Sequence, residues 1–389
     1  MTNRRFGAIA GAILLATAPS VYAAGQGWTR AWTSSLWQGN ERQVIEVDNQ
    51  TLRFQIRVNG GGSAIRLWLG NDFGRMPVRI GRVTAKSASG RVVPVTFSGQ
   101  SSTRIAIGAP VVSDPVTLAV KPFELVEIAV HLPEPTTLVG VHVDRANMLH
   151  ISARGDFTSG EGWAEAGTNE LRPLVAGIDV LGTRQRPVVV AFGDSITDAT
   201  SCSNTAPEPC RWSEVLARRL AAAGKPHVVV NQGIGGNKII TPVAGPNALA
   251  RFDRDVLSIP NVSHVVLLEG INDIGTSGDT RITAEELIEG YRQLVLRAHA
   301  HGIKVIGMTV MPFEGAGYYR PGRDAMREKL NAWIRTPGMV DAVVDMEKVM
   351  ADPANPRRLR ADLQVGDNLH PNDKGQRAMG EAIPLSLFR

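Results

Sequence analysis

Apolar and polar residues alternate along several short segments in the first part of the chain. The clearest of these segments are residues 51–58, 64–69, 78–83 and 127–132. Alternation with a period of two indicates strands that have one face in a core and the other in water. Clusters of Gly, Asn, Ser and Pro separate the segments, as expected for turns. The pattern predicts an antiparallel β-sandwich or jelly-roll domain over residues 24–185.

Residues 146–185, at the end of this part, show little periodicity. They contain several glycines, namely Gly155, Gly160, Gly162 and Gly167. This composition predicts a long linker between two domains or a loop that faces the substrate.

The pattern changes from about residue 186 onward. Continuous apolar runs replace the alternation, at residues 187–192, 227–230, 264–268, 303–308 and 341–345. Such runs are typical of strands that are buried on both faces of a parallel sheet. Helical patterns lie between them; Thr283 and Glu286 form a capping box for a helix that ends near Gly302. The alternation predicts an α/β domain over residues 186–389, so that the 389-residue chain holds two domains.

The chain begins with a pattern typical of an export signal. Arg4 and Arg5 precede an apolar segment at residues 6–18, and small residues follow up to Ala23. We therefore predict a signal peptide over residues 1–23 and a secreted or periplasmic mature protein. A retained membrane anchor is the alternative, but the apolar segment is shorter than the roughly 20 residues of a membrane span. No stable membrane insertion is expected.

Two cysteines, Cys202 and Cys210, lie in one polar loop. An even number, a short loop and an export signal favour a disulfide between them, and two free thiols are the alternative. A zinc site is not expected, because no His or Cys nearby completes a tetrahedral shell. The sequence implies no metal and no organic cofactor.

The composition is that of an ordinary globular protein, with 43% hydrophobic and 20% charged residues. The formal net charge is +5, and loss of Arg4 and Arg5 with the signal peptide would lower it to +3. The basic residues are spread along the chain rather than clustered, so nucleic-acid binding is not expected. The sequence leaves the oligomeric state undetermined.

Polar segments follow the predicted parallel strands at the points where the strands end. These segments are residues 193–198, 231–237 and 269–273, and residues 367–371 precede the last predicted helix. The carboxyl ends of parallel strands meet at one edge of a sheet, where ligands bind. We therefore expect the four segments to come together at that edge.

The four segments contain the residue types that acyl transfer needs. A serine hydroxyl becomes a nucleophile when a histidine takes its proton, and a carboxylate holds that histidine in one tautomer. Ser195, His370 and Asp367 fill these roles, and the Asp-x-x-His spacing lets one turn supply both base and carboxylate. Gly236 and Asn272 are candidate donors to the developing oxyanion.

Together the segments resemble the SGNH hydrolases, the GDSL-type esterase and lipase family. Gly193-Asp194-Ser195 is similar to the GDSL block, and Gly236, Asn272 and Asp367-x-x-His370 are similar to the other three blocks, in the same order. The resemblance covers residues 186–389 and implies a three-layer α/β/α domain with a flavodoxin-like parallel sheet. It also implies an oxyanion hole made of the Ser195 N–H, the Gly236 N–H and the Asn272 side chain.

The match departs from the family pattern in one position. Ile196 stands where the family often has leucine, which exchanges one apolar residue for another. Thr197 takes the position of the second glycine of a Gly-x-Ser-x-Gly elbow, so the segment is not that of an α/β-hydrolase.

The same residues also have structural interpretations. Ser195 is alternatively a helix N-cap, and Asp194 is expected to brace the turn rather than to react. Several tryptophans offer surfaces for stacking on sugar rings, although tryptophans more often fill cores. These are Trp28, Trp32, Trp37 and Trp163.

The sequence thus predicts a secreted serine esterase that hydrolyses carboxylic esters through an acyl-serine intermediate. O-acetyl groups on polysaccharides are the expected substrate, by analogy with exported proteins that carry a β-rich domain. A broad-specificity short-chain carboxylesterase or lipase is one alternative. A catalytically silent glycan-binding protein is the other. The acyl chain length, the alcohol and the regiochemistry are not determined.

Overall fold

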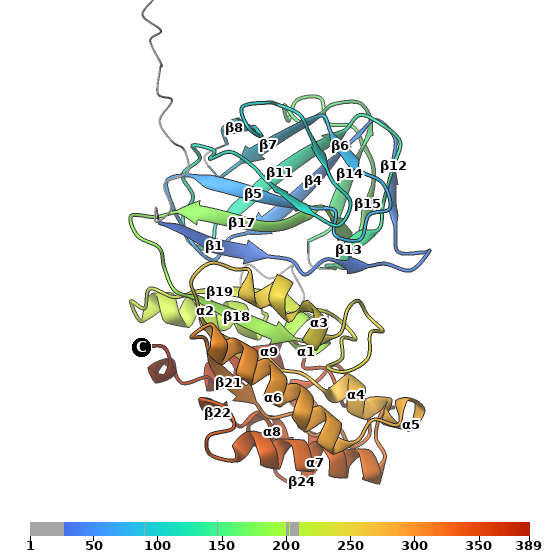
Figure 1. Cartoon of the computed structure of the whole chain (residues 1–389), viewed down its shortest axis with the longest axis vertical. Helices are drawn as coiled ribbons and strands as arrows, with labels where there is room; N and C mark the ends of the chain where they lie inside the picture. Colours follow the sequence, from blue (N-terminus) through green and yellow to red (C-terminus); the bar gives the residue numbers. More distant parts are fainter. Residues whose placement is uncertain (1–26, 89, 146, 200–201, 203–209) are drawn as a thin grey trace, which may run out of the picture.

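The computed structural model describes residues 27–88, 90–145, 147–199, 202 and 210–389, which form a β-rich region followed by an α/β region (Figure 1). The predicted signal peptide over residues 1–23 lies outside the described residues. Each region has a hydrophobic core of its own. Among the described residues, no helix is long and apolar enough to cross a membrane.

The β-rich region is built from short strands paired in antiparallel fashion. Its strands are β1 (Trp28–Thr33), β2 (Trp37–Gln38), β3 (Ile45–Val47), β4 (Gln50–Arg57), β5 (Ile65–Gly70), β6 (Val78–Ile80), β7 (Arg82–Lys86), β8 (Val92–Val95), β9 (Thr103–Ile105), β10 (Pro110–Val112), β11 (Leu125–Leu132), β12 (Thr136–Leu138), β13 (Gly140–Val143), β14 (Leu149–Arg154), β15 (Glu165–Asn169), β16 (Leu171–Pro173) and β17 (Val175–Leu181).

Within the described residues, a four-stranded sheet (β1-β17-β5-β10) and a six-stranded sheet (β15-β14-β4-β11-β7-β8) bury one shared core. The predicted alternation explains the packing, since β4 points Leu52, Phe54 and Ile56 inward while Gln55 stays exposed. The expected antiparallel β fold is confirmed.

Two predictions about this region are wrong. The segment predicted as a connection or a loop over residues 146–185 contains β14 to β17 between residues 149 and 181, and β17 lies between β1 and β5. Bulges interrupt the pairing of β14 with β15 and of β17 with β5, and Leu174 adopts a left-handed conformation. The alternation of apolar and polar residues is therefore broken along this part of the sequence. The segment 78–83 is also not one strand, because β6 and β7 separate at Gly81 and pair in different sheets.

The α/β region contains a parallel sheet in the order β19-β18-β20-β21-β22. Its strands are β18 (Val188–Gly193), β19 (Val228–Gly233), β20 (Val262–Leu268), β21 (Lys304–Met308) and β22 (Ala342–Val344), with a hairpin of β23 (Ala351–Asp352) and β24 (Asn355–Leu359). Its helices are α1 (Ser195–Asp198), α2 (Trp212–Ala222), α3 (Ala248–Phe252), α4 (Ile271–Gly275), α5 (Ser277–Thr280), α6 (Ala284–Ala300), α7 (Pro321–Arg335), α8 (Met346–Met350) and α9 (Asp373–Ala382), with short turns η1 (Asp253–Leu257), η2 (Ala361–Leu363) and η3 (Leu385–Leu387).

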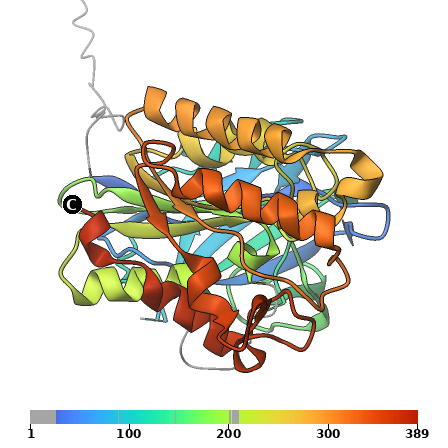
Figure 2. The same ribbon diagram turned by 90° about the horizontal axis from the view of Figure 1, so that it is seen from below.

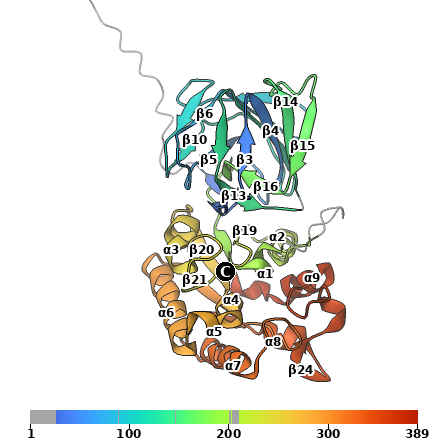
Figure 3. The same cartoon turned by 90° about the vertical axis from the view of Figure 1, so that its right-hand side faces the viewer.

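Helices cover both faces of this sheet. Helix α2 packs against α9 and α6 packs against α7, and Figures 2 and 3 show the two pairs on opposite sides of the strands. The predicted capping box is present at Thr283 and Glu286 and begins α6. The predicted three-layer α/β/α fold with a parallel sheet is therefore confirmed.

The two regions meet along β19, an edge strand of the parallel sheet. Strand β1 lies beside it, and Thr33 Oγ1 donates to the Asn231 carbonyl over 2.8 Å. Asn59 Nδ2 donates to the Val229 carbonyl over 2.8 Å. The β-rich region therefore satisfies carbonyl groups that an uncovered edge strand would present to solvent.

Candidate active site

Ser195 lies in a tight turn between β18 and α1. Gly193 makes the turn possible, because an added Cβ there would lie 2.2 Å from the Leu268 carbonyl oxygen. Asp194 is the N-cap of α1, and its Oδ1 accepts from the Ile196 N–H over 2.9 Å. Ser195 is the first residue of the helix, so its N–H has no acceptor within the helix. The turn leaves Ser195 partly exposed, and Asp194 braces it, as expected from the sequence.

Ser195, His370 and Asp367 form a hydrogen-bonded chain. Ser195 Oγ lies 3.0 Å from His370 Nε2, and His370 Nδ1 lies 2.6 Å from Asp367 Oδ2. The carboxylate accepts a hydrogen bond from Nδ1–H, and in this tautomer Nε2 is free to accept the serine proton. Asp367 Oδ1 also accepts from the backbone N–H groups of Leu369 and His370, over 2.9 Å each.

The environment of Asp367 favours its charged form. Partial burial acts to raise its pKa, but the hydrogen bonds from the His370 ring and from the backbone of residues 369 and 370 outweigh it, and the pKa is lowered. The loop between η2 and α9 thus carries an ionised carboxylate and the imidazole it orients.

The two other candidate residues lie at the ends of β19 and β20. Gly236 has a left-handed backbone, with φ of +78°, and Asn272 is buried in α4. Asn272 Nδ2 donates one proton to the Asn237 carbonyl over 2.9 Å, and its Oδ1 accepts from the Tyr318 hydroxyl over 3.2 Å. These bonds fix the amide orientation and leave its second N–H for another acceptor. The sequence did not suggest Tyr318 or Asn237.

A pair of buried carboxyl groups lies below this turn. Asp194 and Glu269 follow Gly193 and Leu268, which are register partners in β18 and β20, and a side-chain hydrogen bond joins them. Burial raises the pKa of Asp194 to about 6. Burial and the neighbouring Asp194 raise the pKa of Glu269 well above its ordinary value. Sequence reasoning missed Glu269, although an acidic residue directly after an apolar strand is a signal for it.

Arg251 connects the strand ends to one another. It is buried in α3 and donates to the carbonyls of Gly193 and Gln232 and to Asn237 Oδ1, over 2.9, 2.7 and 2.8 Å. Its Nη2 lies 3.9 Å from Glu269 Oε1. No pattern in the sequence pointed to this residue, because its partners are distant along the chain.

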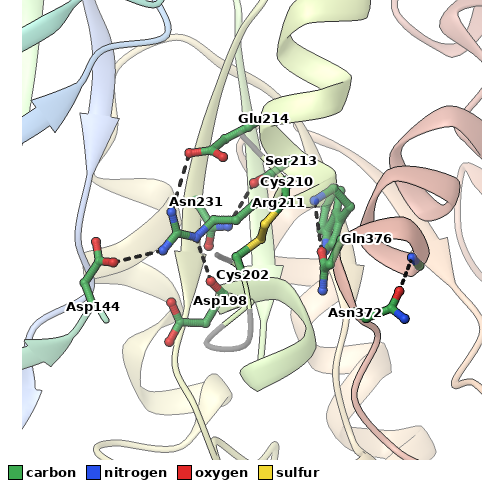
Figure 4. The surroundings of a disulfide bond; sticks show 12 residues. Asp144, Asp198, Cys202, Cys210, Arg211, Ser213, Glu214, Asn231, Asn372 and Gln376 are labelled. Atoms are coloured by element: carbon green, nitrogen blue, oxygen red, sulfur yellow. Dashed lines mark hydrogen bonds and ion pairs between the residues drawn. A yellow bond between two sulfur atoms is a disulfide. The ribbon is translucent and has the colours of Figure 1, made fainter. Parts of the chain in front are cut away.

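Cys202 and Cys210 are disulfide-bonded, as predicted, with Cα atoms 5.8 Å apart. Arg211 follows directly and lies between Asp144 of the β-rich region and Glu214 of α2 (Figure 4). Its Nε donates to the Asp198 carbonyl at the end of α1 over 2.8 Å. The disulfide therefore lies beside a buried ionic contact between the two regions.

One group of residues among those described is close enough to hold a metal ion, namely Cys202, Cys210 and Asp373. The two sulfur atoms are bonded to each other, so they cannot serve as thiolate ligands while the disulfide is intact. The geometry of the site at Ser195 provides for proton transfer and acyl transfer by side chains.

Comparison with known proteins identifies the segment that carries this site. Residues 191–378 match the GDSL-like lipase/acylhydrolase family. This segment is a GDSL-like lipase/acylhydrolase domain. The resemblance inferred from the four sequence blocks is thereby confirmed. The roles of the individual residues in the GDSL domain remain predictions.

A curated relative and two solved structures are similar to the chain. The lipoprotein YqeF of Bacillus subtilis (strain 168), described as uncharacterized, is 32% identical over 133 residues, which are 33% of this chain and 51% of the relative. The chain thus spans about half the length of that relative. A GDSL-like lipase from Bacteroides thetaiotaomicron VPI-5482 has a TM-score of 0.40 and 21% identity and covers 51% of this chain and 87% of its own. A catalytic mutant of Axe2, an acetylxylan esterase from Geobacillus stearothermophilus, has a TM-score of 0.39 and 21% identity. The match covers 50% of this chain and 91% of the Axe2 chain.

Proposed function

We propose that this protein hydrolyses carboxylic esters through an acyl-serine intermediate. The observation that carries the proposal is the hydrogen-bonded chain from Ser195 Oγ through His370 to Asp367. Such a chain activates a hydroxyl that is otherwise a weak nucleophile. Membership of residues 191–378 in the lipase/acylhydrolase family supports the same reaction class.

In the acylation step, Ser195 Oγ attacks the ester carbonyl while His370 Nε2 takes its proton. The carbonyl oxygen becomes an oxyanion, which accepts hydrogen bonds from the Ser195 N–H, the Gly236 N–H and Asn272 Nδ2. The tetrahedral intermediate collapses, the C–O bond to the alcohol breaks, and His370 returns the proton to the leaving oxygen. Asp367 keeps His370 in the required tautomer throughout.

In the second step, water replaces the alcohol. His370 Nε2 takes a proton from the water, whose oxygen attacks the acyl carbon, and the same donors bind the second oxyanion. Collapse of this intermediate breaks the bond to Ser195 Oγ, which regains its proton from His370. The carboxylic acid leaves, and the enzyme returns to its starting state.

The proposed substrates are O-acetyl groups on an extracellular polysaccharide, processed by a secreted or periplasmic protein after cleavage of residues 1–23. Residues 24–185 would form one domain and residues 186–389 the catalytic one, which the two separate hydrophobic cores support. Short-chain carboxylesterase or lipase activity on small esters is the alternative within this reaction class. A catalytically silent glycan-binding protein is the alternative outside it.

The test is hydrolysis of p-nitrophenyl acetate by the wild type, by Ser195→Ala and by Ser159→Ala. Ser159 is an exposed serine of the β-rich region and serves as the matched control. We expect Ser195→Ala to lose activity and Ser159→Ala to retain it. A fluorophosphonate reagent should transfer its phosphonyl group to Ser195 with loss of fluoride, so the peptide that contains Ser195 should gain the mass of that group. Equal rates for the wild type and Ser195→Ala, or a wild type inert on every short ester, would refute the proposal.

A further inference from the structure

A groove of about 650 Å³ lies between the β-rich region and the α/β region. One wall comes from the segment around β2 and from Phe73, and the other from residues 242–247, which follow β19. Figure 1 shows β1, in blue, along the face of the β-rich region that lies against the α/β region. The groove therefore forms only where the two regions meet.

The groove is lined by aromatic, amide and small apolar groups. Trp37 and Phe73 provide rings, and Arg254 covers the ring of Phe73 at 5.3 Å from its centroid. Gln38, Asn40 and Gln43 provide side-chain amides. Of the described residues that line it, none carries a charge. Aromatic faces suit the C–H faces of sugar rings, and amides suit their hydroxyl groups.

Trp37 differs from the other tryptophans that the sequence suggested for stacking. Arginine side chains cover the rings of Trp28, Trp32 and Trp163, at 4.7, 4.9 and 3.8 Å from the ring centroids. Within the described residues, no arginine covers the ring of Trp37 in this way, and the side chain lines the groove. Trp37 is therefore the one of the four that lines this groove and has no arginine over its ring among the described residues.

The wall of the groove is connected directly to the proposed oxyanion donors. Asn237 Nδ2 donates to the carbonyls of Ala244 and Pro246, over 2.8 and 2.9 Å, and the Asn237 carbonyl accepts from Asn272. An added Cβ at Gly236 would lie 3.3 Å from the Ala244 Cβ. A ligand in the groove therefore lies against the same loop that holds the candidate oxyanion site.

The other wall is held in place as well. An added Cβ at Gly245 would lie 2.7 Å from the Trp37 Cβ, so the backbone of this loop packs closely on Trp37. Gly245 also has a left-handed backbone, with φ of +70°, which favours glycine there. Trp37 is thus fixed before a ligand binds, which reduces the entropy lost on binding.

We propose that this groove binds the uncharged sugar residues of a glycan chain next to the residue whose ester is cleaved, with Trp37 as the stacking platform. This inference rests on the proposed esterase function and assigns a binding subsite to its proposed polysaccharide substrate. It also assigns a role to the β-rich region, which supplies one wall of the subsite.

The test compares esters on a chain with esters on a single sugar. Acetate release is measured from acetylated xylo-, manno- and cello-hexaoses and from the corresponding acetylated monosaccharides. For each variant, the readout is the ratio of kcat/KM on the hexaose to kcat/KM on the monosaccharide. We expect Trp37→Ala to lower this ratio about tenfold or more, Trp37→Phe to keep most of it, and Trp163→Ala to leave it unchanged.

A second variant tests the groove independently, in case Trp37→Ala does not fold. Val243 is 68% exposed on the opposite wall, so Val243→Glu should fold while it places a charge in the groove. We expect it to lower the same ratio. Unchanged ratios in Trp37→Ala and Val243→Glu would overturn the proposal. A wild type that cleaves p-nitrophenyl acetate but no acetylated hexaose would also overturn it. So would variants that lose activity on p-nitrophenyl octanoate alone, because that result would indicate a site for the acyl chain.

A binding measurement separates this proposal from the esterase reaction. Calorimetric titration with the unmodified xylo-, manno- and cello-hexaoses requires no catalysis. We expect at least one hexaose to bind the wild type and to bind Trp37→Ala about tenfold more weakly. If the wild type hydrolysed no ester but bound in this way, the proposed function would fail while the glycan site stood. Absence of binding to all three hexaoses would overturn the site.

Discussion

Asp194 and Glu269 are hydrogen-bonded to each other at the ends of adjacent parallel strands, although both are carboxyl groups and both are buried. Among the described residues, no N–H or hydroxyl group donates to Asp194 Oδ2 or to Glu269 Oε1. Ionised carboxylates only accept hydrogen bonds, so one proton must lie between the two groups. The residue that caps α1 therefore depends on a neighbour from β20 that the sequence blocks do not include.

Replacement of Glu269 tests whether Asp194 needs this donor. Glu269→Gln keeps an N–H that donates to Asp194, whereas Glu269→Leu leaves a buried carboxyl oxygen without a partner. We expect Glu269→Leu to lower the free energy of unfolding by about 1–3 kcal/mol more than Glu269→Gln does. Urea unfolding followed by circular dichroism measures the difference. Equal losses in the two variants would show that the shared proton contributes nothing.

The same pair predicts how stability changes with pH. A carboxyl group with a raised pKa in the folded state holds its proton more tightly there, so its stabilising effect is complete at low pH and is lost as the pH rises. For Asp194, whose ordinary pKa is 3.8, this window extends from about 4 to about 6. The pKa of Glu269 is also raised, so its contribution to the free energy of unfolding likewise decreases as the pH rises, at higher pH than that of Asp194.

We therefore expect the unfolding free energy of the wild type, relative to that of Glu269→Gln, to decrease as the pH rises above about 4.5. The amide that replaces the carboxyl group in this variant does not titrate, so the difference reports the proton that Asp194 and Glu269 share. Urea unfolding of both proteins at several pH values between about 4.5 and about 7.5 measures it. A difference that grows with pH would contradict the assignment of the proton.

Asp367 should matter for rate rather than for stability. Asp367→Asn keeps the shape of the side chain but favours the wrong tautomer of His370, so we expect kcat on p-nitrophenyl acetate to fall by a factor on the order of 10³–10⁴. Asp362→Asn is the matched control, since Asp362 pairs with Arg360 and Lys374 on the surface nearby. A loss in Asp362→Asn as large as that in Asp367→Asn would indicate a local structural effect.

Asn272 and Tyr318 allow the oxyanion role to be tested in two steps. Asn272→Ala removes the amide donor, and we expect kcat to fall about 10²–10³-fold with a smaller change in KM. Tyr318→Phe removes only the hydroxyl that orients the amide through its Oδ1, so we expect a loss of less than about tenfold. Steady-state kinetics on p-nitrophenyl acetate measures both. If Asn272→Ala changed KM alone, the residue would bind the substrate without stabilising the oxyanion.

Asp144 should hold the two regions together. It pairs with Arg172 over 2.9 Å and with Arg211 over 3.1 Å, and these three side chains are largely buried. Burial acts to raise the pKa of Asp144, but the two arginines and His142 outweigh burial and lower this pKa. Removal of one member of a buried ionic cluster leaves an unpaired charge, so Asp144→Ala should cost about 3–5 kcal/mol.

Glu170→Ala provides the control for this variant. Glu170 pairs with Arg145 on the surface of the same region, and an exposed pair contributes at most about 1 kcal/mol. Thermal unfolding of both variants measures the difference. Similar midpoints for Asp144→Ala and Glu170→Ala would show that the ionic contact does not stabilise the arrangement.

The parts of the fold that could be predicted are those with a regular local pattern. The apolar runs predicted the strands of the parallel sheet, and the capping box at Thr283 and Glu286 predicted the start of α6. Residues 146–185 were misinterpreted because bulges shift the strand register there. A pattern with a period of two disappears when the register shifts by one residue.

The sequence by itself located the residues to which the proposed chemistry is assigned, because Ser195, Gly236, Asn272 and the Asp367-x-x-His370 turn each lie in a short, recognisable segment. The tertiary structure decided which other residues support them. Glu269, Arg251 and Tyr318 contact the site through pairs that are distant in sequence, and such contacts depend on how whole elements pack. The groove beside Trp37 has the same origin, since each region contributes one wall.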